Sequence, residues 1–207
     1  RSTSVSARSQ RLGILSEVKE LIILHPNHAI PILSDFEATS TQSIQFIMPA
    51  KRISLKNAKQ EKLFYFVANV VVYRGKDGRC LILKRSEREK VHPGRWAVLG
   101  GKLEWGQFDI KNPTRLNGDV VDFENAVEDL LCREVKEEAG IEIFPDFKYI
   151  NSNMFIRPDE TPVVLVKFAA RYKKGQVVPQ PGDFTDFAWA NEKEIKKYPC
   201  IDGIPKE

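Results

Sequence analysis

The sequence predicts an α+β fold built around a mixed β-sheet. Three observations support this: runs rich in aromatic and β-branched residues come first, one strong amphipathic helix follows, and further strand-like runs come after it. The order is therefore strands, helix, strands, helix, without an internal repeat. For a chain of 207 residues, this favours one domain of ordinary size with an appendage.

The composition is that of an ordinary globular protein, with 42% hydrophobic and 29% charged residues and a formal net charge of +4. Acidic and basic residues are mixed along most of the chain, whereas a dedicated nucleic-acid or membrane binder would show more bias. The longest apolar stretch, residues 64–73, is shorter than a membrane span of roughly 18 residues. We therefore expect neither a nucleic-acid partner nor a membrane partner.

The cysteines, Cys80, Cys132 and Cys200, are widely spaced and form neither a Cys-x-x-Cys pair nor a zinc site with histidine. We interpret them as reduced core thiols and expect a cytoplasmic location. Residues 1–11 are rich in serine and arginine, which is typical of a transit peptide, but we assign them no role in the fold.

Residues 1–60 are expected to be an N-terminal extension. Between residues 12 and 24 the apolar positions recur at helical spacing, and His25-Pro26-Asn27 ends the run, so one amphipathic helix is predicted there. Residues 28–60 carry scattered Pro, Ser and Thr around a short apolar segment at 44–48. We expect the extension to pack on the core or to join two copies of the chain as a homodimer.

The remaining residues, 61–207, are expected to form the main domain. A β-hairpin opens it, with turn chemistry at 74–79, and Gly100-Gly101 marks a close approach of the backbone to another group. Gly140 ends a strong helix, and Asn191 is expected to cap a closing one. Strands are predicted at 63–73, 80–84, 96–99, 147–156, 162–172 and 186–190, and helices at 124–139 and 191–197.

The helix at 124–139 carries an unusual acidic face. Glu134, Glu137 and Glu138 fall within roughly a third of its circumference, beside the apolar arc. Like charges at this spacing cost about a few tenths of a kcal/mol each, and more when they are partly desolvated, unless a cation neutralises them. A divalent metal is one neutraliser; the alternative is a solvated charged face in which Arg133 pairs with Glu137.

The surrounding sequence favours the metal. Gly101-Lys-Leu-Glu-Trp-Gly106 followed by Arg133-Glu-Val-Lys-Glu-Glu-Ala-Gly-Ile141 resembles the two halves of the Nudix box, and the resemblance extends over residues 63–197. It implies an α/β/α sandwich with a mixed sheet. Two departures stand out: Gln107 occupies a position where the family has Glu, and residues 108–122 form an insertion between the two halves.

The resemblance implies hydrolysis of a phosphoanhydride bond in a nucleoside diphosphate derivative. Glu134, Glu137, Glu138 and the Gly101 carbonyl would hold Mg²⁺, with Mn²⁺ as a substitute, because these hard cations prefer oxygen ligands. Arg133 would orient Glu137. Lys102 and Arg85 are assigned to substrate binding, although a basic surface loop is an equal alternative for Arg85.

Two carboxylates compete for the role of general base. Glu134 is the first candidate, because a ligand carboxylate can accept a proton from water. Asp183 is the second, because the segment Gly182 to Trp189 resembles a family segment in which an acid precedes a tryptophan by six residues. A loop aspartate making an Asx-turn is the alternative for Asp183.

The substrate is less defined by the sequence. Pro158 resembles a proline of members that act on ADP-ribose, while nucleotide sugars and nucleoside triphosphates are kept as alternatives. Trp96 and Trp105 flank the glycine pair; Trp96 is expected to pack in the core. The competing functions are a nucleotide-binding sensor that has lost turnover, favoured by Gln107 and the insertion, and a scaffold that docks through residues 12–60.

Overall fold

The computed structural model describes residues 49–206. The chain divides into two units, Arg1–Phe46 and Ile47–Glu207, and everything below concerns the second. The helix predicted at residues 12–24 and the apolar segment predicted at 44–48 lie outside the described residues.

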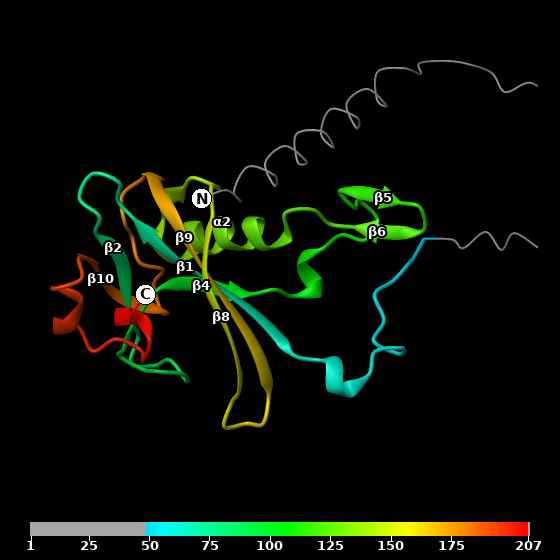
Figure 1. Ribbon diagram of the computed structural model, residues 1–207, viewed down its shortest axis with the longest axis horizontal. Coiled ribbons are helices and arrows are strands. Elements are labelled where there is room, and N and C mark those ends of the chain that lie inside the picture. The colour runs from blue at the N-terminus through cyan, green and yellow to red at the C-terminus, as the bar shows by residue number, and fades with distance from the viewer. Residues whose placement is uncertain (1–48, 207) are drawn as a thin grey trace, which may run out of the picture. The chain divides into compact units, whose positions relative to one another are not determined.

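One mixed sheet forms the body of the domain (Figure 1). Its strands run in the order β10-β2-β1-β9-β7, and β3, β4 and β8 pair on β2, β1 and β9 respectively. The bounds are β1 Tyr65–Tyr73, β2 Cys80–Arg85, β3 Trp96–Ala97, β4 Leu99–Lys102, β7 Glu142–Ile143, β8 Lys148–Ile156, β9 Pro162–Lys174 and β10 Phe184–Ala190. The mixed α+β fold expected from the sequence is confirmed.

The two central strands, β1 and β9, are parallel and pair along the whole of β1. Side chains alternate between the faces of a strand, and Ala68, Val70 and Val72 are fully buried on one face of β1. The hairpin predicted at the start of the domain is formed only at its closed end, where Tyr73 pairs with Cys80. Beyond that point β1 pairs with β4 and β2 with β10, because the twisted strands diverge.

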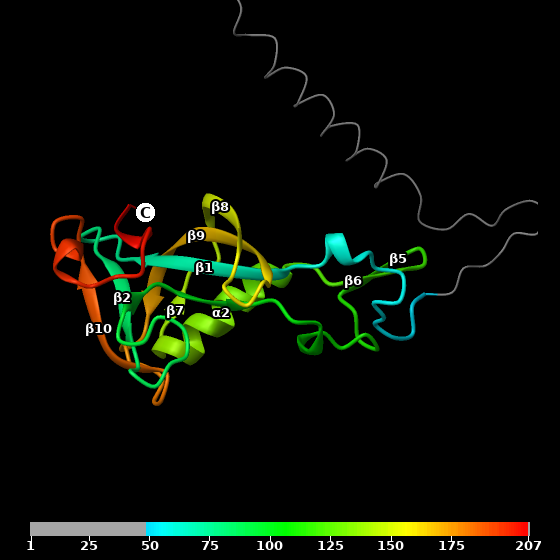
Figure 2. The ribbon, with the colours of Figure 1, turned by 90° about the horizontal axis from the view of Figure 1, so that it is seen from below.

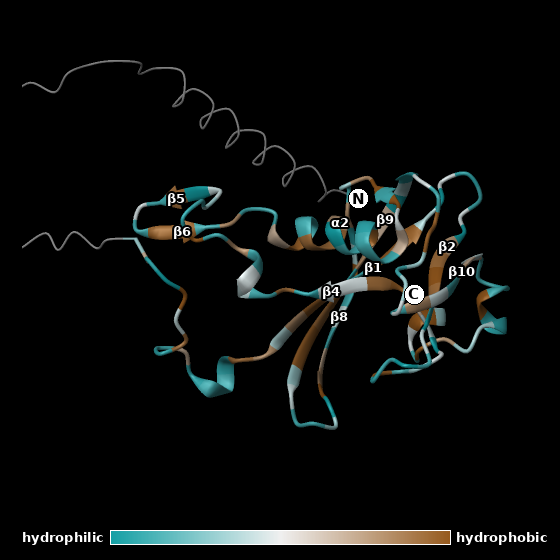
Figure 3. Ribbon diagram, turned by 180° about the vertical axis from the view of Figure 1, so that it is seen from behind, coloured by the Kyte–Doolittle hydropathy of each residue, from teal (hydrophilic) through white to brown (hydrophobic). Residues whose placement is uncertain are grey.

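Helix α2, Ala126–Ala139, packs on β4 and β1. Its buried side chains are Leu130, Leu131, Val135 and Ala139, whereas its outward turns are mostly hydrophilic (Figure 3). The helix runs beside β1 and β4 in both views of the ribbon (Figures 1 and 2). Gly140 ends it in the left-handed conformation, with a φ of 70°.

The closing helix predicted at 191–197 is wrong in its extent. The Asn191 side chain accepts hydrogen bonds from the amides of Lys193 and Glu194, as a cap would, but only the 3₁₀ turn η3, Ile195–Lys197, follows. The helix stops because the next residues return to the sheet. The Trp96 amide donates to the Pro199 carbonyl, and the Ile201 amide donates to Trp96.

The insertion at residues 108–122 carries secondary structure of its own. It contains a two-stranded sheet of β5, Arg115–Asn117, and β6, Val120–Asp122. The 3₁₀ turn η2, Trp105–Gln107, precedes it, and the Phe108 and Phe123 rings close its base at 5.0 Å between centroids. Among the described residues, no helix has the length and apolar character needed to span a bilayer.

Candidate active site

Strand β4 brings two glycines to the acidic face of α2. Gly100 and Gly101 pair with Asn69 and Ala68 of β1. Gly100 has a φ of 153°, and a Cβ there would overlap the Ala68 carbonyl oxygen, so only glycine fits. The close approach predicted at this pair is confirmed.

Glu138 is hydrogen-bonded to this backbone. The Gly100 amide donates to Glu138 Oε2 at 3.0 Å. Burial raises the pKa of Glu138 to about 8; Glu134 and Asp183 add to the rise, while the Gly100 amide and Arg85 oppose it. Glu138 therefore lies among two other carboxylates and one guanidinium.

Glu134 lies against the second glycine. A Cβ on Gly101 would overlap the carboxyl carbon of Glu134, so the absence of a side chain at Gly101 makes room for this carboxylate. Its side chain is 18% exposed. Burial raises the pKa of Glu134, Arg133 opposes the rise, and Glu137 and Glu104 add to it.

Arg133 contacts Glu134 more closely than Glu137. Its Nη2 donates to Glu134 Oε1 at 2.9 Å, whereas its Nε is 4.0 Å from Glu137 Oε1. Glu137 is 57% exposed, and the buried Arg133 Nε has no hydrogen-bond partner among the described residues. The pairing expected at i+4 is thus the weaker of the two, because the neighbouring Glu134 is held closer by Gly101.

Asp183 and Arg85 approach the site from β10 and β2. The Ser86 amide donates to the Asp183 carbonyl at 2.7 Å, which holds Asp183 at the start of β10. Arg85 forms an ion pair with Glu89 and donates through Nε to the Val91 carbonyl at 2.8 Å. Arg85 lowers and Asp183 raises the pKa of Glu138. The fold therefore brings both residues near Glu138, although each is about fifty positions from it in the sequence.

The end of β4 and the turn that follows it carry Lys102, Trp105 and Gln107, and β3 carries Trp96. The Lys102 ammonium lies 5.8 Å from the centre of the Tyr65 ring, and Gln107 donates to the Lys102 carbonyl at 3.3 Å. Gln107 therefore ties the loop to itself. Trp96 is buried, as predicted, whereas Trp105 is 61% exposed.

Glu104 is a site residue that the sequence analysis did not single out. It lies close enough to Glu134 to raise the pKa of that carboxyl. The signal was present, since Glu104 stands three residues after Gly101 in the first half of the box, but its orientation depends on the path of the loop.

The donor set fits a hard divalent cation. Glu134 and Glu138 are partly buried carboxylates with raised pKa values beside the Gly100-Gly101 backbone, and such crowding is relieved by a cation. The side chains are not gathered beforehand: within residues 49–206 no group of three or more His, Cys, Asp or Glu is close enough to hold a metal. Glu137 would have to turn toward the other two.

Comparison with known proteins supports the fold and identifies the family. The family model described as NUDIX domain matches residues 65–203. A NAD-capped RNA hydrolase NudC of Stutzerimonas stutzeri is 30% identical over 137 residues, which cover 66% of this chain and 40% of the relative. The match therefore spans less than half of that protein.

Two solved structures share the fold. The MutT protein of Methanosarcina mazei Go1 is 19% identical, with a TM-score of 0.50 and coverage of 72% of this chain and 92% of that one. The NUDIX domain of Shewanella oneidensis NrtR, complexed with ADP ribose, is 16% identical, with a TM-score of 0.50 and coverage of 71% and 86%. At these identities the likeness concerns the fold alone.

Proposed function

The chain belongs to the Nudix family, and from that premise we propose that it hydrolyses a phosphoanhydride bond in a nucleoside diphosphate derivative with the help of Mg²⁺. One observation carries the proposal: two carboxylates of one helix, Glu134 and Glu138, are held against the Gly100-Gly101 backbone. A pure binding surface has no need of such crowded acidic groups, in which Glu134 raises the pKa of Glu138.

Glu134, Glu138 and the Gly101 carbonyl would hold the cation, with Glu137 completing the set, and Mn²⁺ would substitute. The bound cation would neutralise phosphate charge and help to orient the diphosphate. The protein supplies the positioning: Gly101 leaves room for Glu134, the Gly100 amide orients Glu138, and Arg133 pairs with Glu134.

Glu134 is our first candidate for the base that takes a proton from the attacking water. Its pKa is raised by burial, and a base is most effective when its pKa approaches the working pH. Asp183 is the second candidate, because it lies near enough to Glu138 to raise the pKa of that carboxyl. The buried Arg133 Nε lies 4.0 Å from Glu137 Oε1 and makes no hydrogen bond among residues 49–206, so it would be available to donate to a phosphate oxygen.

Lys102 and Arg85 are proposed to contact substrate phosphates. Lys102 is exposed beside the site. Arg85 is already paired with Glu89, so a phosphate would have to share or displace that carboxylate, which makes Lys102 the stronger of the two.

Derivatives in which a diphosphate joins two ribose units are the proposed substrate class. The S. stutzeri relative is a NAD-capped RNA hydrolase, and the S. oneidensis domain binds ADP ribose; NAD and ADP-ribose share this diphosphate. The relative's name also includes RNA, so an RNA-linked substrate belongs in the panel although the composition argues against a dedicated nucleic-acid binder. Nucleotide sugars and nucleoside triphosphates complete the panel.

A nucleotide-binding sensor without turnover is the second candidate. It is favoured by Gln107, whose side chain bonds to its own loop at the Lys102 carbonyl, so this position does not tie the loop to α2. Three further expectations remain proposals: the N-terminal extension over residues 1–60, a homodimer formed through it, and a cytoplasmic location, which the free thiols Cys80, Cys132 and Cys200 suit.

The deciding experiment is a turnover assay with NAD, ADP-ribose, NAD-capped RNA, a nucleotide sugar and a nucleoside triphosphate, each with Mg²⁺ and with EDTA. We expect Mg²⁺-dependent cleavage of at least one diphosphate. Tight binding without cleavage of any member would favour the sensor.

A further inference from the structure

A pocket of about 640 Å³ lies away from the acidic face of α2. Such a volume suits a ligand of nucleotide size. The pocket is bounded by the β1–β2 turn, the end of β9 and β10. The charged and aromatic side chains that line it are Arg74, Lys76, Arg171, Tyr172, Phe187 and Trp189.

Aromatic rings and guanidinium groups make up its walls. The Arg74 guanidinium lies 4.6 Å from the centre of the Trp189 ring, and Tyr172 meets Trp189 edge-on at 5.6 Å. The Arg171 guanidinium lies 4.2 Å from the centre of the Phe144 ring. Phe187 remains 38% exposed, so a flat apolar surface is available beside positive charge.

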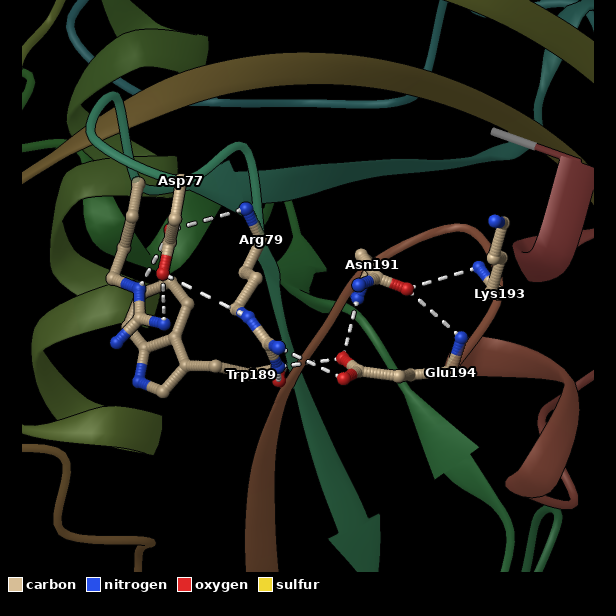
Figure 4. Close-up of polar contacts among 7 residues, drawn as sticks. Asp77, Arg79, Trp189, Asn191, Lys193 and Glu194 are labelled. Carbon is tan, nitrogen blue, oxygen red and sulfur yellow. Dashed lines mark hydrogen bonds and ion pairs between the residues drawn. The ribbon is translucent and has the colours of Figure 1, made fainter.

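Polar contacts hold two of these walls together (Figure 4). Arg79 donates to the Trp189 carbonyl at 3.0 Å and to Glu194 at 2.8 Å, and Asp77 pairs with Arg74 at 2.5 Å. The turn that carries Arg74 and Lys76 is thereby bound to β10. The pocket is therefore arranged before any ligand arrives.

The charge of the pocket is positive. Asp77 balances Arg74, but Lys76 on the rim is exposed and Arg171 contributes a further positive charge. A ligand that matches this arrangement carries a flat aromatic group and an anionic group. A nucleotide has both, because every base offers a π-face and its phosphate offers negative charge.

The pocket is connected to the candidate active site without being part of it. Asp183 precedes β10, and at about 3.3 Å per residue Phe187 lies roughly 13 Å farther along the strand. The loop between β9 and β10 contributes Val177 to the pocket and then donates from the Gln180 amide to the Glu138 carbonyl. A ligand in this pocket would lie farther along β10 than Asp183 and outside the proposed catalytic residues.

We propose that this pocket binds a nucleotide unit, with the base on Phe187 beside Trp189 and the phosphate at Lys76 and Arg171. Two sources share this chemistry: a free mononucleotide, and a nucleotide of a longer chain whose end is at the catalytic site. The proposal concerns binding and does not require turnover.

Calorimetric titration of the full chain in EDTA tests it, since EDTA prevents metal-dependent cleavage. The probes are AMP and a 5′-phosphorylated tetra-adenylate. Lys76→Glu and Phe187→Ser change exposed side chains of the pocket, and Lys148→Glu and Phe155→Ser make the same changes on exposed residues of β8. Circular dichroism establishes that each variant is folded.

We expect both pocket variants to weaken binding by at least about tenfold, since stacking and phosphate contacts each contribute that much, and the β8 variants to bind as the wild type does. Tighter pocket-dependent binding of the tetra-adenylate than of AMP would identify a longer chain as the source; equal binding would identify the mononucleotide. Binding of neither probe, or equal loss in the β8 variants, would overturn the proposal.

Discussion

The carboxyl group of Glu134 occupies the space that a side chain at Gly101 would need. This relationship places α2 against β4 where two of the proposed metal ligands, Glu134 and the Gly101 carbonyl, lie side by side. A methyl group at Gly101 would push Glu134 away while leaving the backbone conformation accessible, because Gly101 is not among the glycines with positive φ.

We therefore expect Gly101→Ala to keep the fold and to lower Mg²⁺-dependent turnover by at least about tenfold, through displacement of one ligand. Gly106→Ala is the matched control, because a Cβ there meets nothing within 4 Å. Steady-state kinetics and thermal unfolding separate the effects. Equal rates for the two variants would show that the position of Glu134 does not matter.

The exposed Glu137 gives a test of the metal assignment. Glu137→Gln should leave the fold intact and remove most Mg²⁺-dependent turnover, because an amide is a poorer ligand for a hard cation than a carboxylate. In EDTA its thermal stability should be unchanged or higher, since repulsion from Glu134 is relieved. Near-normal rates at saturating Mg²⁺ would contradict the assignment, and marked destabilisation would favour a structural pair with Arg133.

The raised pKa of Glu138 predicts that the stability of the fold depends on pH in metal-free buffer. Burial raises its pKa in the folded state from the ordinary 4.5 to about 8, so the folded state binds the proton more tightly than the unfolded state. The contribution of the Glu138 carboxyl to the free energy of unfolding is therefore fully present below pH 4.5 and is lost as the pH rises toward 8.

Glu138→Gln should therefore be more stable than the wild type at pH 8 in EDTA, with a smaller decline between pH 5 and pH 8. Glu137→Gln removes the same charge from an exposed position and is the control. Denaturant unfolding at several pH values measures the difference. An identical decline in wild type and Glu138→Gln would refute the prediction.

The two candidate bases are separated by comparing Glu134→Gln with Asp183→Asn at saturating Mg²⁺ and substrate. A general base contributes about 10² to 10⁴-fold to the rate, whereas loss of a lesser ligand mainly weakens metal affinity. We expect the larger loss in kcat for Glu134→Gln, without rescue by extra Mg²⁺. The reverse pattern would assign the base to Asp183.

The β5–β6 hairpin is proposed to cover the substrate. Replacing residues 115–122 with a short Gly/Ser linker preserves the Phe108–Phe123 contact at its base. We expect a raised KM or a relaxed choice of substrate, with Mg²⁺ binding retained. A surface excursion without a role in binding would instead lower stability and leave KM unchanged across the panel.

The sequence by itself determined the order of the main strands and of α2, the acidic face of α2 and the close backbone approach at the Gly100-Gly101 pair. These follow from local rules: the period of apolar residues, the spacing of charges on a helix and the conformational freedom of glycine. The end of α2 at Gly140 was predictable for the same reason.

Only the tertiary structure decided which neighbours these elements meet. Arg133 contacts Glu134 more closely than Glu137, because Gly101 leaves room for the Glu134 carboxylate. The closing helix shortens because Pro199 and Ile201 pair with Trp96. Glu104 joins the site, and Arg74 meets Trp189, across distances in sequence that no local pattern encodes. Such contacts depend on sheet order and strand twist, which arise from packing the whole domain.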